Sequence, residues 1–249
     1  MRLTVVGCSG SFPAAESACS SYLVEADGYR LLLDLGSGAL GPLQRYTDPY
    51  QVDAVVLSHL HPDHCMDLCG YYVARKYRPG GPVLPRLPVY GPDRTAERMA
   101  GAYGMSQDPG MREAFDFRTL RPGRFELGPF TLRVDRVNHP VETFATRVEH
   151  DGRSVTYSAD TGESDGLVRL AAGTDLLLCE ASFLDGRDVV PNLHLNGRQA
   201  GEHAARAGAG RLVLTHIPPW TDAERNLADG CGAFTGPVEL ARPGTAYDL

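Results

Sequence analysis

The sequence predicts an α/β protein in which mixed β-sheets are covered by helices. Apolar, β-branched runs that are typical of strands alternate along the chain with helical patterns. Two of the apolar runs are interrupted by an Asp-Gly pair, Asp27-Gly28 and Asp151-Gly152, and such a pair between strands is typical of a β-hairpin. Hairpins give antiparallel pairs and helical crossovers give parallel ones, so sheets of mixed direction are expected.

The first half of the chain contributes four expected strand regions and two helices. Pro62 cannot continue a strand and suits the first position of a helix, so a helix is expected directly after the third strand region. The expected strands cover 3–11, 20–36 (the first hairpin), 53–59 and 87–91, and the expected helices cover 63–77 and 93–104.

The second half repeats this alternation. Asn196 followed by Gln199 is a capping-box pattern, which predicts the start of the last helix. The expected strands cover 131–139, 146–160 (the second hairpin), 175–181 and 211–216, and the expected helices cover 164–172 and 196–208.

Length and composition indicate one soluble domain over residues 1–249. No linker or low-complexity tract divides the chain, and no segment approaches the roughly 20 apolar residues of a membrane span. The start lacks the apolar stretch of a signal peptide, so a cytoplasmic protein without a membrane partner is expected. The six cysteines form no C-x-x-C pair and suit free thiols in a reducing compartment. Cys65 and Cys69 are interpreted as helix-packing residues, with metal contact as the alternative.

The densest functional signal is a cluster of three histidines and an aspartate between His59 and His64, in a chain with eight histidines. His59 and His61 are two residues apart at a strand end and face the same side. The helix after Pro62 carries Asp63 and His64 back over the same point. Such a cluster indicates a bound metal, and the alternative interpretation is a chance surface cluster of polar residues.

Five apolar strands also end in a histidine or an acidic residue. The carboxyl ends of strands form the ligand crevice in open α/β sheets, so one shared site is expected there. The five terminal residues are His59, His139, Asp160, Glu180 and His216.

The motifs "HLHPDH", "NHP", "SADTG" and "LTHIPP" resemble the ordered ligand motifs of the metallo-β-lactamase superfamily. The resemblance implies an αββα sandwich of two mixed β-sheets flanked by helices, with a site for two divalent metal ions. It implies that His59, His61 and His139 hold one metal, that Asp63, His64 and His216 hold the other, and that Asp160 bridges both. The resemblance also implies a catalytic role for Asp63. The His-rich set favours Zn²⁺, while a bridging carboxylate also tolerates Mn²⁺.

Further segments resemble the ribonuclease Z and phosphodiesterase branch: "GCSGSFP", "LLLDLGSG", "LPVYGP", "CEASF" and "HLNGRQAGEHAARAG". This resemblance implies that His194 acts with Glu180 to stabilise the phosphate and protonate the leaving oxygen. The alternative for His194 is a loop residue before a helix cap. His150, expected in a hairpin turn, and His203, expected on an exposed helix, are left out of the site.

Three departures argue against a transfer-RNA nuclease. His139 and Asp160 are separated by one short hairpin, which leaves little room for the tRNA-gripping arm usual in bacterial ribonuclease Z. The "IPPW" after His216 lacks the arginine that is common at this position in ribonuclease Z. The formal net charge of −7 opposes binding of long polyanions.

The basic residues are concentrated between residues 71 and 136, a segment that contains 12 Lys/Arg and 7 Asp/Glu. Arg75, Arg78 or Arg86 could present positive charge to an anionic substrate at the mouth of the site. Alternatively these arginines have no special role, because Lys76 is the only lysine and arginine is the general basic residue of the chain.

The sequence therefore predicts a dinuclear metal-dependent hydrolase that cleaves small or cyclic nucleotide-type phosphodiesters. A tRNA 3′-end endonuclease is the first alternative, and a lactone, thioester or lactam hydrolase is the second, disfavoured by the presence of Glu180 and His194. A metal-binding protein without catalysis is disfavoured because all seven ligand positions are filled. The expected partner is a small anionic substrate. Long nucleic acid is disfavoured but left open, as is a homodimer.

Overall fold

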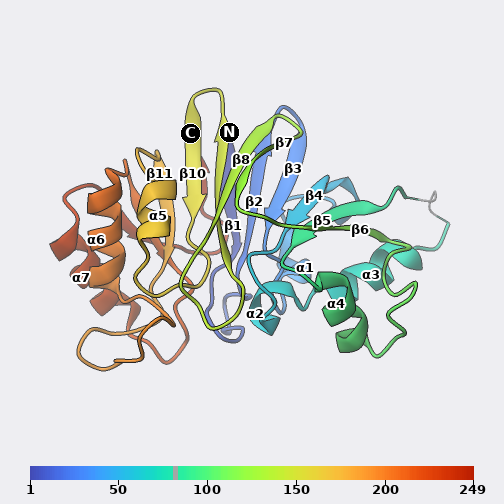
Figure 1. The fold of residues 1–249 in the computed structure, drawn as a ribbon, viewed down its shortest axis with the longest axis horizontal. Helices are drawn as coiled ribbons and strands as arrows, with labels where there is room; N and C mark the ends of the chain where they lie inside the picture. The colour runs from blue at the N-terminus through green and yellow to red at the C-terminus, as the bar shows by residue number, and fades with distance from the viewer. Residues whose placement is uncertain (81–83) are drawn as a thin grey trace.

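The computed structural model describes residues 1–80 and 84–249 and contains two seven-stranded β-sheets packed face to face. Helices lie on the outer face of each sheet, which gives four layers in the order αββα (Figure 1). Each sheet combines antiparallel and parallel pairs, as the hairpin and crossover signals predict. The expected fold class, a metallo-β-lactamase-type sandwich, is confirmed.

The first sheet has the strand order β14-β1-β2-β3-β4-β5-β6. Its hairpin around Asp27-Gly28 joins β2 and β3, and from β3 onward the pairs are parallel. The strands are β1 (Arg2–Gly7), β2 (Ser21–Ala26), β3 (Tyr29–Leu33), β4 (Ala54–Val56), β5 (Leu87–Gly91), β6 (Phe115–Thr119) and β14 (Ala246–Asp248).

The second sheet has the order β13-β12-β11-β10-β9-β8-β7. Like the first sheet, it combines antiparallel pairs on one side with parallel pairs on the other. Its hairpin around Asp151-Gly152 joins β9 and β10, and the pairs from β10 to β13 are parallel. The strands are β7 (Gly123–Leu127), β8 (Phe130–Arg136), β9 (Phe144–His150), β10 (Arg153–Tyr157), β11 (Leu176–Glu180), β12 (Leu212–Thr215) and β13 (Val238–Leu240).

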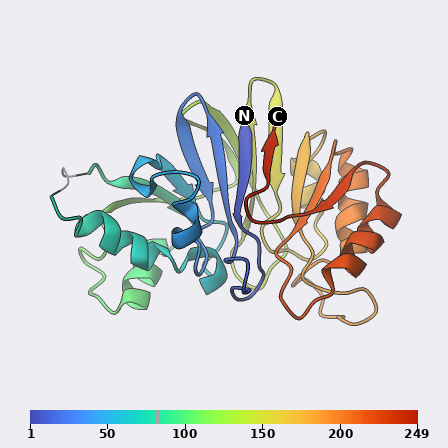
Figure 2. The ribbon, with the colours of Figure 1, turned by 180° about the vertical axis from the view of Figure 1, so that it is seen from behind.

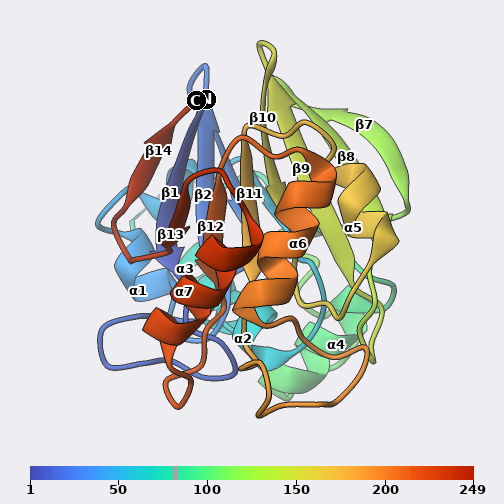
Figure 3. The same cartoon turned by 90° about the vertical axis from the view of Figure 1, so that its left-hand side faces the viewer.

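Helices α1–α4 flank the first sheet and α5–α7 flank the second (Figures 2 and 3). Among the described residues, no helix is both long and apolar enough to cross a membrane. The helices are α1 (Leu40–Leu43), the 3₁₀ helix η1 (Pro49–Gln51), α2 (Pro62–Cys65), α3 (Leu68–Lys76), α4 (Thr95–Tyr103), α5 (Asp165–Leu170), α6 (Gly197–Ala207) and α7 (Ala223–Ala233).

Three buried apolar clusters hold the layers together. The central one lies between the sheets and includes Leu3, Tyr22 and Phe130. The second packs α1–α4 against the first sheet, and the third packs α5 and α6 against the second. Both sheets are thus buried on two faces, which explains why their central strands read as continuous apolar runs rather than as alternating ones.

The expected helix 63–77 is wrong in one respect, because it is broken into α2 and α3 at Met66 and Asp67. The Asp67 N–H donates to the Leu35 carbonyl at 3.2 Å. Its carboxylate accepts the N–H groups of Gly38 and Leu40 at 2.9 and 2.8 Å. Contacts with the loop after β3 thus replace the helix at this position.

The interpretation of His203 as an exposed helix residue is also wrong, because it is 1% exposed. Its Nδ1 bonds the Gln199 carbonyl at 2.8 Å, and its Nε2 accepts the Ser164 N–H at 3.0 Å. It thus joins α6 to the start of α5. The capping box of α6 is confirmed, with the Asn196 side chain accepting the Gln199 N–H at 2.9 Å.

Helix α7 was not expected, since its sequence "AERNLADGCGA" has no apolar stripe. It packs against α6 through small residues and through Asn226, which is fully buried. The Asn226 side chain accepts the Gly197 N–H at 2.9 Å and donates to the Ala181 carbonyl at 2.7 Å. A Cβ on Gly197 would lie 2.0 Å from the Asn226 carbonyl oxygen.

We therefore expect Gly197→Ala to lower the free energy of unfolding by about 1–3 kcal/mol, the usual cost of overpacking. The matched control is Gly101→Ala on the exposed face of α4, where a Cβ meets nothing within 4 Å. That change should raise stability by roughly 0.5–1 kcal/mol, because alanine is the better helix former. Urea unfolding of both variants measures the difference, and an equally stable Gly197→Ala protein would contradict the close packing of α6 on α7.

Candidate metal centre

The site lies at the edge where the parallel strands of both sheets end, near α2 at the bottom of Figure 1 and opposite the chain termini. His59 follows β4, His139 follows β8, Asp160 follows β10 and His216 follows β12. Glu180 is the last residue of β11. The parallel direction of these strands brings side chains from distant parts of the sequence to one point, as expected from the strand-end pattern.

A first group of potential ligands consists of His59, His61, His139 and Asp160, whose ligand atoms lie within 4.8 Å of one another. His61 Nδ1 is 3.0 Å from His59 Nε2 and 3.3 Å from His139 Nε2. His59 Nε2 is 3.7 Å from an oxygen of Asp160. Three ring nitrogens and a carboxylate thus converge on one small space.

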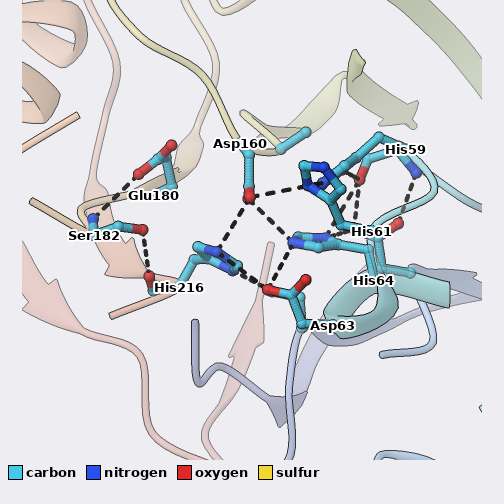
Figure 4. A network of polar contacts seen from close by, with 12 residues as sticks. His59, His61, Asp63, His64, Asp160, Glu180, Ser182 and His216 are labelled. Atoms are coloured by element: carbon cyan, nitrogen blue, oxygen red, sulfur yellow. Dashed lines mark hydrogen bonds and ion pairs between the residues drawn. The ribbon is translucent and has the colours of Figure 1, made fainter. Parts of the chain in front are cut away.

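A second group consists of Asp63, His64, Asp160 and His216, and all four are buried. Asp160 Oδ1 is 3.2 Å from His64 Nε2, and Asp160 Oδ2 is 3.2 Å from His216 Nε2. Asp63 Oδ2 is 3.6 Å from both of these nitrogens. Asp160 belongs to both groups and lies between them (Figure 4).

Glu180 and His194 form a third group with Asp160. Glu180 is fully buried, and its Oε1 is 2.8 Å from His194 Nδ1. The same carboxylate accepts the N–H of Thr161, the residue after Asp160, at 2.7 Å and that of Ser182 at 3.1 Å. Its position is therefore fixed relative to the proposed bridging aspartate.

Each buried histidine uses its second ring nitrogen for a contact that orients the ring. His216 Nδ1 lies 2.9 Å from the Ser20 hydroxyl, and His139 Nδ1 donates to the Leu193 carbonyl at 2.9 Å. His59 Nδ1 lies 3.1 Å from the Ser58 hydroxyl. In each case Nε2 is left directed at the centre.

Asp34 is a site residue that sequence reasoning missed. It is fully buried and accepts four hydrogen bonds, from the Ser58 N–H and hydroxyl at 2.6 and 2.7 Å, from His64 Nδ1 at 2.7 Å and from the Tyr157 hydroxyl at 2.8 Å. The available signal was an acidic residue directly after the apolar strand in "LLLDLGSG".

Two glycines let the backbone approach the ligands closely. A Cβ on Gly36 would lie 1.9 Å from the Asp63 carbonyl oxygen, and one on Gly10 would lie 2.4 Å from that of His216. The N–H of Ser11, next to Gly10, donates to Asp63 Oδ2 at 2.8 Å. The loop after β1 therefore packs directly against the second ligand group.

The residues present fit bound cations. Buried Nε2 of His64 and Oδ1 of Asp160 lie 3.2 Å apart without the geometry of a hydrogen bond, and neither has another partner, although such atoms are normally satisfied. Among the described residues, no Lys or Arg forms an ion pair with Asp34, Asp63, Asp160 or Glu180. Buried charges are normally paired or bound to a metal, so this acidic, His-rich pocket is suited to divalent ions.

The pKa shifts agree with this fit. Burial, together with the nearby His64, lowers the pKa of His59 well below its ordinary value, and burial also lowers the pKa of His61 and of His139. These rings are neutral at pH 7 and keep a lone pair for a metal. Burial acts in the same direction on His64, but Asp160 and Asp34 reverse it and raise its pKa well above the ordinary value. The buried carboxylates Asp160 and Asp34 thus favour positive charge at the His64 ring.

The structure brings together all nine residues that the sequence proposed for the site: His59, His61, Asp63, His64, His139, Asp160, Glu180, His194 and His216. Two of the three proposed arginines instead make contacts elsewhere. Arg75 is buried and donates to the Pro85 carbonyl at 2.6 Å, and Arg78 lies over the Tyr50 ring at 4.1 Å. Cys65 packs in the helix core, as expected.

Known proteins match over most of the chain. A family model described as a β-lactamase superfamily domain matches residues 29–217. An uncharacterised protein of Mycobacterium leprae is 44% identical, covering 100% of this chain and 89% of that one. The probable metallo-hydrolase YhfI of Bacillus subtilis is 34% identical over both full lengths. Its crystal structure matches with a TM-score of 0.89 and covers 99% of this chain and 98% of that one. A ribonuclease Z of Mycolicibacterium gilvum is 34% identical, over 88% of this chain and 85% of that one.

The contacts of Asp34 generate a prediction about metal affinity. Asp34→Asn should weaken metal binding by roughly 10- to 100-fold, the usual effect of removing an outer partner, because His64 loses its carboxylate acceptor. Titration against a chelator and elemental analysis after dialysis measure the loss. Asp53→Asn is the control, since Asp53 also accepts a backbone N–H, that of Arg30 at 2.8 Å, but at the surface. Equal affinity of the two variants would refute this role of Asp34.

Proposed function

The chain belongs to the metallo-β-lactamase superfamily of metallo-hydrolases, and we propose that it is a dinuclear phosphodiesterase acting on small or cyclic nucleotide-type substrates. The observation that carries this proposal is the pairing of His194 with the buried Glu180 beside Asp160. An alkoxide leaving group needs an acid, and this pair can supply one.

We propose that the first ligand group, His59, His61 and His139, holds one ion, that Asp63, His64 and His216 hold the other, and that Asp160 contacts both. The five imidazoles favour Zn²⁺, while Mn²⁺ suits the carboxylates. When bound, two such ions would activate water and neutralise charge on the attacked phosphate.

The chain's own residues supply the proton. Burial alone would lower the pKa of His194, but the negative charge and hydrogen bond of Glu180, together with Asp160, raise it to about 9. These interactions favour the imidazolium form of the ring, which has an N–H group on each nitrogen. Its Nδ1 donates to Glu180, so Nε2 is the nitrogen free to donate to the leaving oxygen. Glu180 fixes the ring orientation and supports its positive charge.

The remaining geometry favours a small substrate. Between His139 and Asp160 the chain forms only β9 and β10, and their connecting turn lies at the end of the sheet opposite the site. No arm for a long nucleic acid is built from this segment. The net charge of −7 also disfavours a polyanion.

Ribonuclease Z relatives support a second candidate, cleavage of tRNA precursors at the 3′ end. A third chemistry, hydrolysis of lactones, thioesters or lactams, is less well supported because it does not explain a His–Glu acid pair.

A substrate panel tests the proposal. Protein loaded with Zn²⁺ or Mn²⁺ should hydrolyse bis(p-nitrophenyl) phosphate or a cyclic nucleotide and should trim a tRNA precursor poorly at physiological salt, because no arm grips the tRNA. Lactone, thioester and β-lactam substrates serve as comparisons. Efficient precursor cleavage would favour the ribonuclease Z candidate, and activity on the comparison substrates alone would reject a phosphodiesterase.

His194→Ala tests the proposed acid. The variant should keep its metal content, because His194 is not a proposed ligand, and should lose roughly 10²- to 10⁴-fold in rate on alkyl or ribose esters. The loss should be much smaller with p-nitrophenolate as the leaving group, which departs without a proton. Glu180→Gln should show the same pattern with a smaller loss. Equal losses on good and poor leaving groups would instead assign His194 to phosphate binding.

A further inference from the structure

Several exposed apolar side chains lie on loops that carry or contact residues of the metal centre. Isolated exposed apolar residues are ordinary, but a cluster of them beside a polar site marks a binding surface. Of the eight large apolar residues exposed in the described part of the chain, three lie on or next to α3 and α4, namely Val73, Tyr77 and Tyr103. The other five lie on loops that contain a site residue or contact one: Phe12, Val141, Val189, Val190 and Trp220.

Two of these residues, Phe12 and Trp220, form an aromatic pair. Their ring centroids are 5.0 Å apart with an angle of 38° between the planes. Phe12 is 42% exposed and Trp220 is 60% exposed, so contact between the rings leaves a large aromatic surface facing solvent. The two residues come from different loops, after β1 and after β12, which pack together through a bridge between Ser9 and Ile217.

The pair borders the second ligand group. Phe12 directly follows Ser11, whose N–H bonds Asp63, so its Cα lies one chain step of about 3.8 Å from that of Ser11. Trp220 lies four residues after His216. Both residues therefore lie on backbone that adjoins the second ligand group.

The backbone on both sides of the pair is held in place. Arg187 donates to the Trp220 carbonyl at 3.5 Å and to the Thr221 hydroxyl at 3.2 Å. That hydroxyl donates to the Ser182 carbonyl at 3.0 Å, and the Ser9 hydroxyl donates to the Phe12 carbonyl at 2.7 Å. The rings are exposed but their attachment is rigid, which reduces the entropic cost of binding a ligand.

We propose that Trp220, supported by Phe12, is a stacking platform for the nucleobase of a nucleotide phosphodiester whose phosphate lies at the metal centre. The inference rests on the proposed function and names the part of the substrate that extends beyond the metals. Every base has a flat π-face, so stacking on an aromatic ring tolerates different bases. The platform should therefore select nucleotides over phosphodiesters without a base, with little preference among bases.

Trp220 is the only tryptophan of the chain, so its fluorescence reports on the platform alone. Metal-loaded protein is titrated with AMP and with ribose 5-phosphate, which has the same phosphate and sugar but no base. Excitation at the red edge of tryptophan absorption avoids absorption by the base. We expect saturable quenching by AMP and none by ribose 5-phosphate over the same concentrations. This readout does not depend on turnover.

A kinetic comparison of two esters measures the contribution of the nucleobase to kcat/KM. Thymidine 5′-(p-nitrophenyl phosphate) and methyl p-nitrophenyl phosphate share the scissile bond and leaving group, and only the first carries a base. Trp220→Ala should lower the ratio of their kcat/KM values by roughly 5- to 150-fold, the range for loss of one stacked base. Trp220→Phe should restore most of the ratio. Tyr77→Ala, at an equally exposed aromatic residue beyond α3, is the matched control and should leave the ratio unchanged.

The outcomes separate this inference from the proposed function. Equal quenching by AMP and ribose 5-phosphate, or an unchanged ratio in Trp220→Ala while both esters are hydrolysed, would overturn the platform and leave the phosphodiesterase intact. Saturable quenching by AMP without hydrolysis of either ester would support the platform and reject the phosphodiesterase. Loss of a dimer in Trp220→Ala without any quenching by AMP would assign the pair to self-association and overturn the inference.

Discussion

The structure depends on the burial of several carboxylates beside five histidines without a paired Lys or Arg among the described residues. Such a group would be strongly destabilising in a low-dielectric interior unless cations balance it. The fold meets this constraint in two ways. Asp34 and Glu180 are saturated with hydrogen bonds, whereas Asp160 keeps an oxygen without any. The unsatisfied atoms thus mark where cations would bind, and the satisfied carboxylates orient the rings around them.

Holding the ligands also requires unusual backbone. Asp34, Ala159 and His216 have φ values of 58°, 55° and 54°, in the left-handed region that side-chain-bearing residues rarely adopt. Each occurs just after a buried strand, where the chain must turn sharply to direct an acid or an imidazole at the centre. Strain of this kind costs of order 1–3 kcal/mol per residue and persists only where the surroundings impose it. The two sheets, each buried on both faces, provide that rigid framework.

Signals that are local in sequence predicted most of the site. The strand-ending residues and the histidine cluster indicated a shared centre because parallel strands bring their ends together, and the family resemblance ordered the ligands. Effects that depend on tertiary contacts were not predictable in this way. The break at Asp67 follows from contacts with the loop after β3, helix α7 is stabilised by close glycine packing against α6, and Arg75 is buried by its tertiary neighbours. None of these has a periodic pattern in the sequence.

One loop, between β11 and α6, connects the metal ligands, the proposed proton donor and the aromatic pair. The segment between β11 and α6 begins after Glu180. Its Arg187 holds the backbone at Trp220, and its Leu193 carbonyl orients His139. The same segment carries His194, which pairs with Glu180. A shift of this loop would therefore move the proposed proton donor, a metal-facing ring and the aromatic pair together. Because the loop carries His194 and contacts the backbone at Trp220, its position couples leaving-group chemistry to substrate recognition. A change in this one connection would therefore alter both, and through the Leu193 carbonyl it would also reach His139.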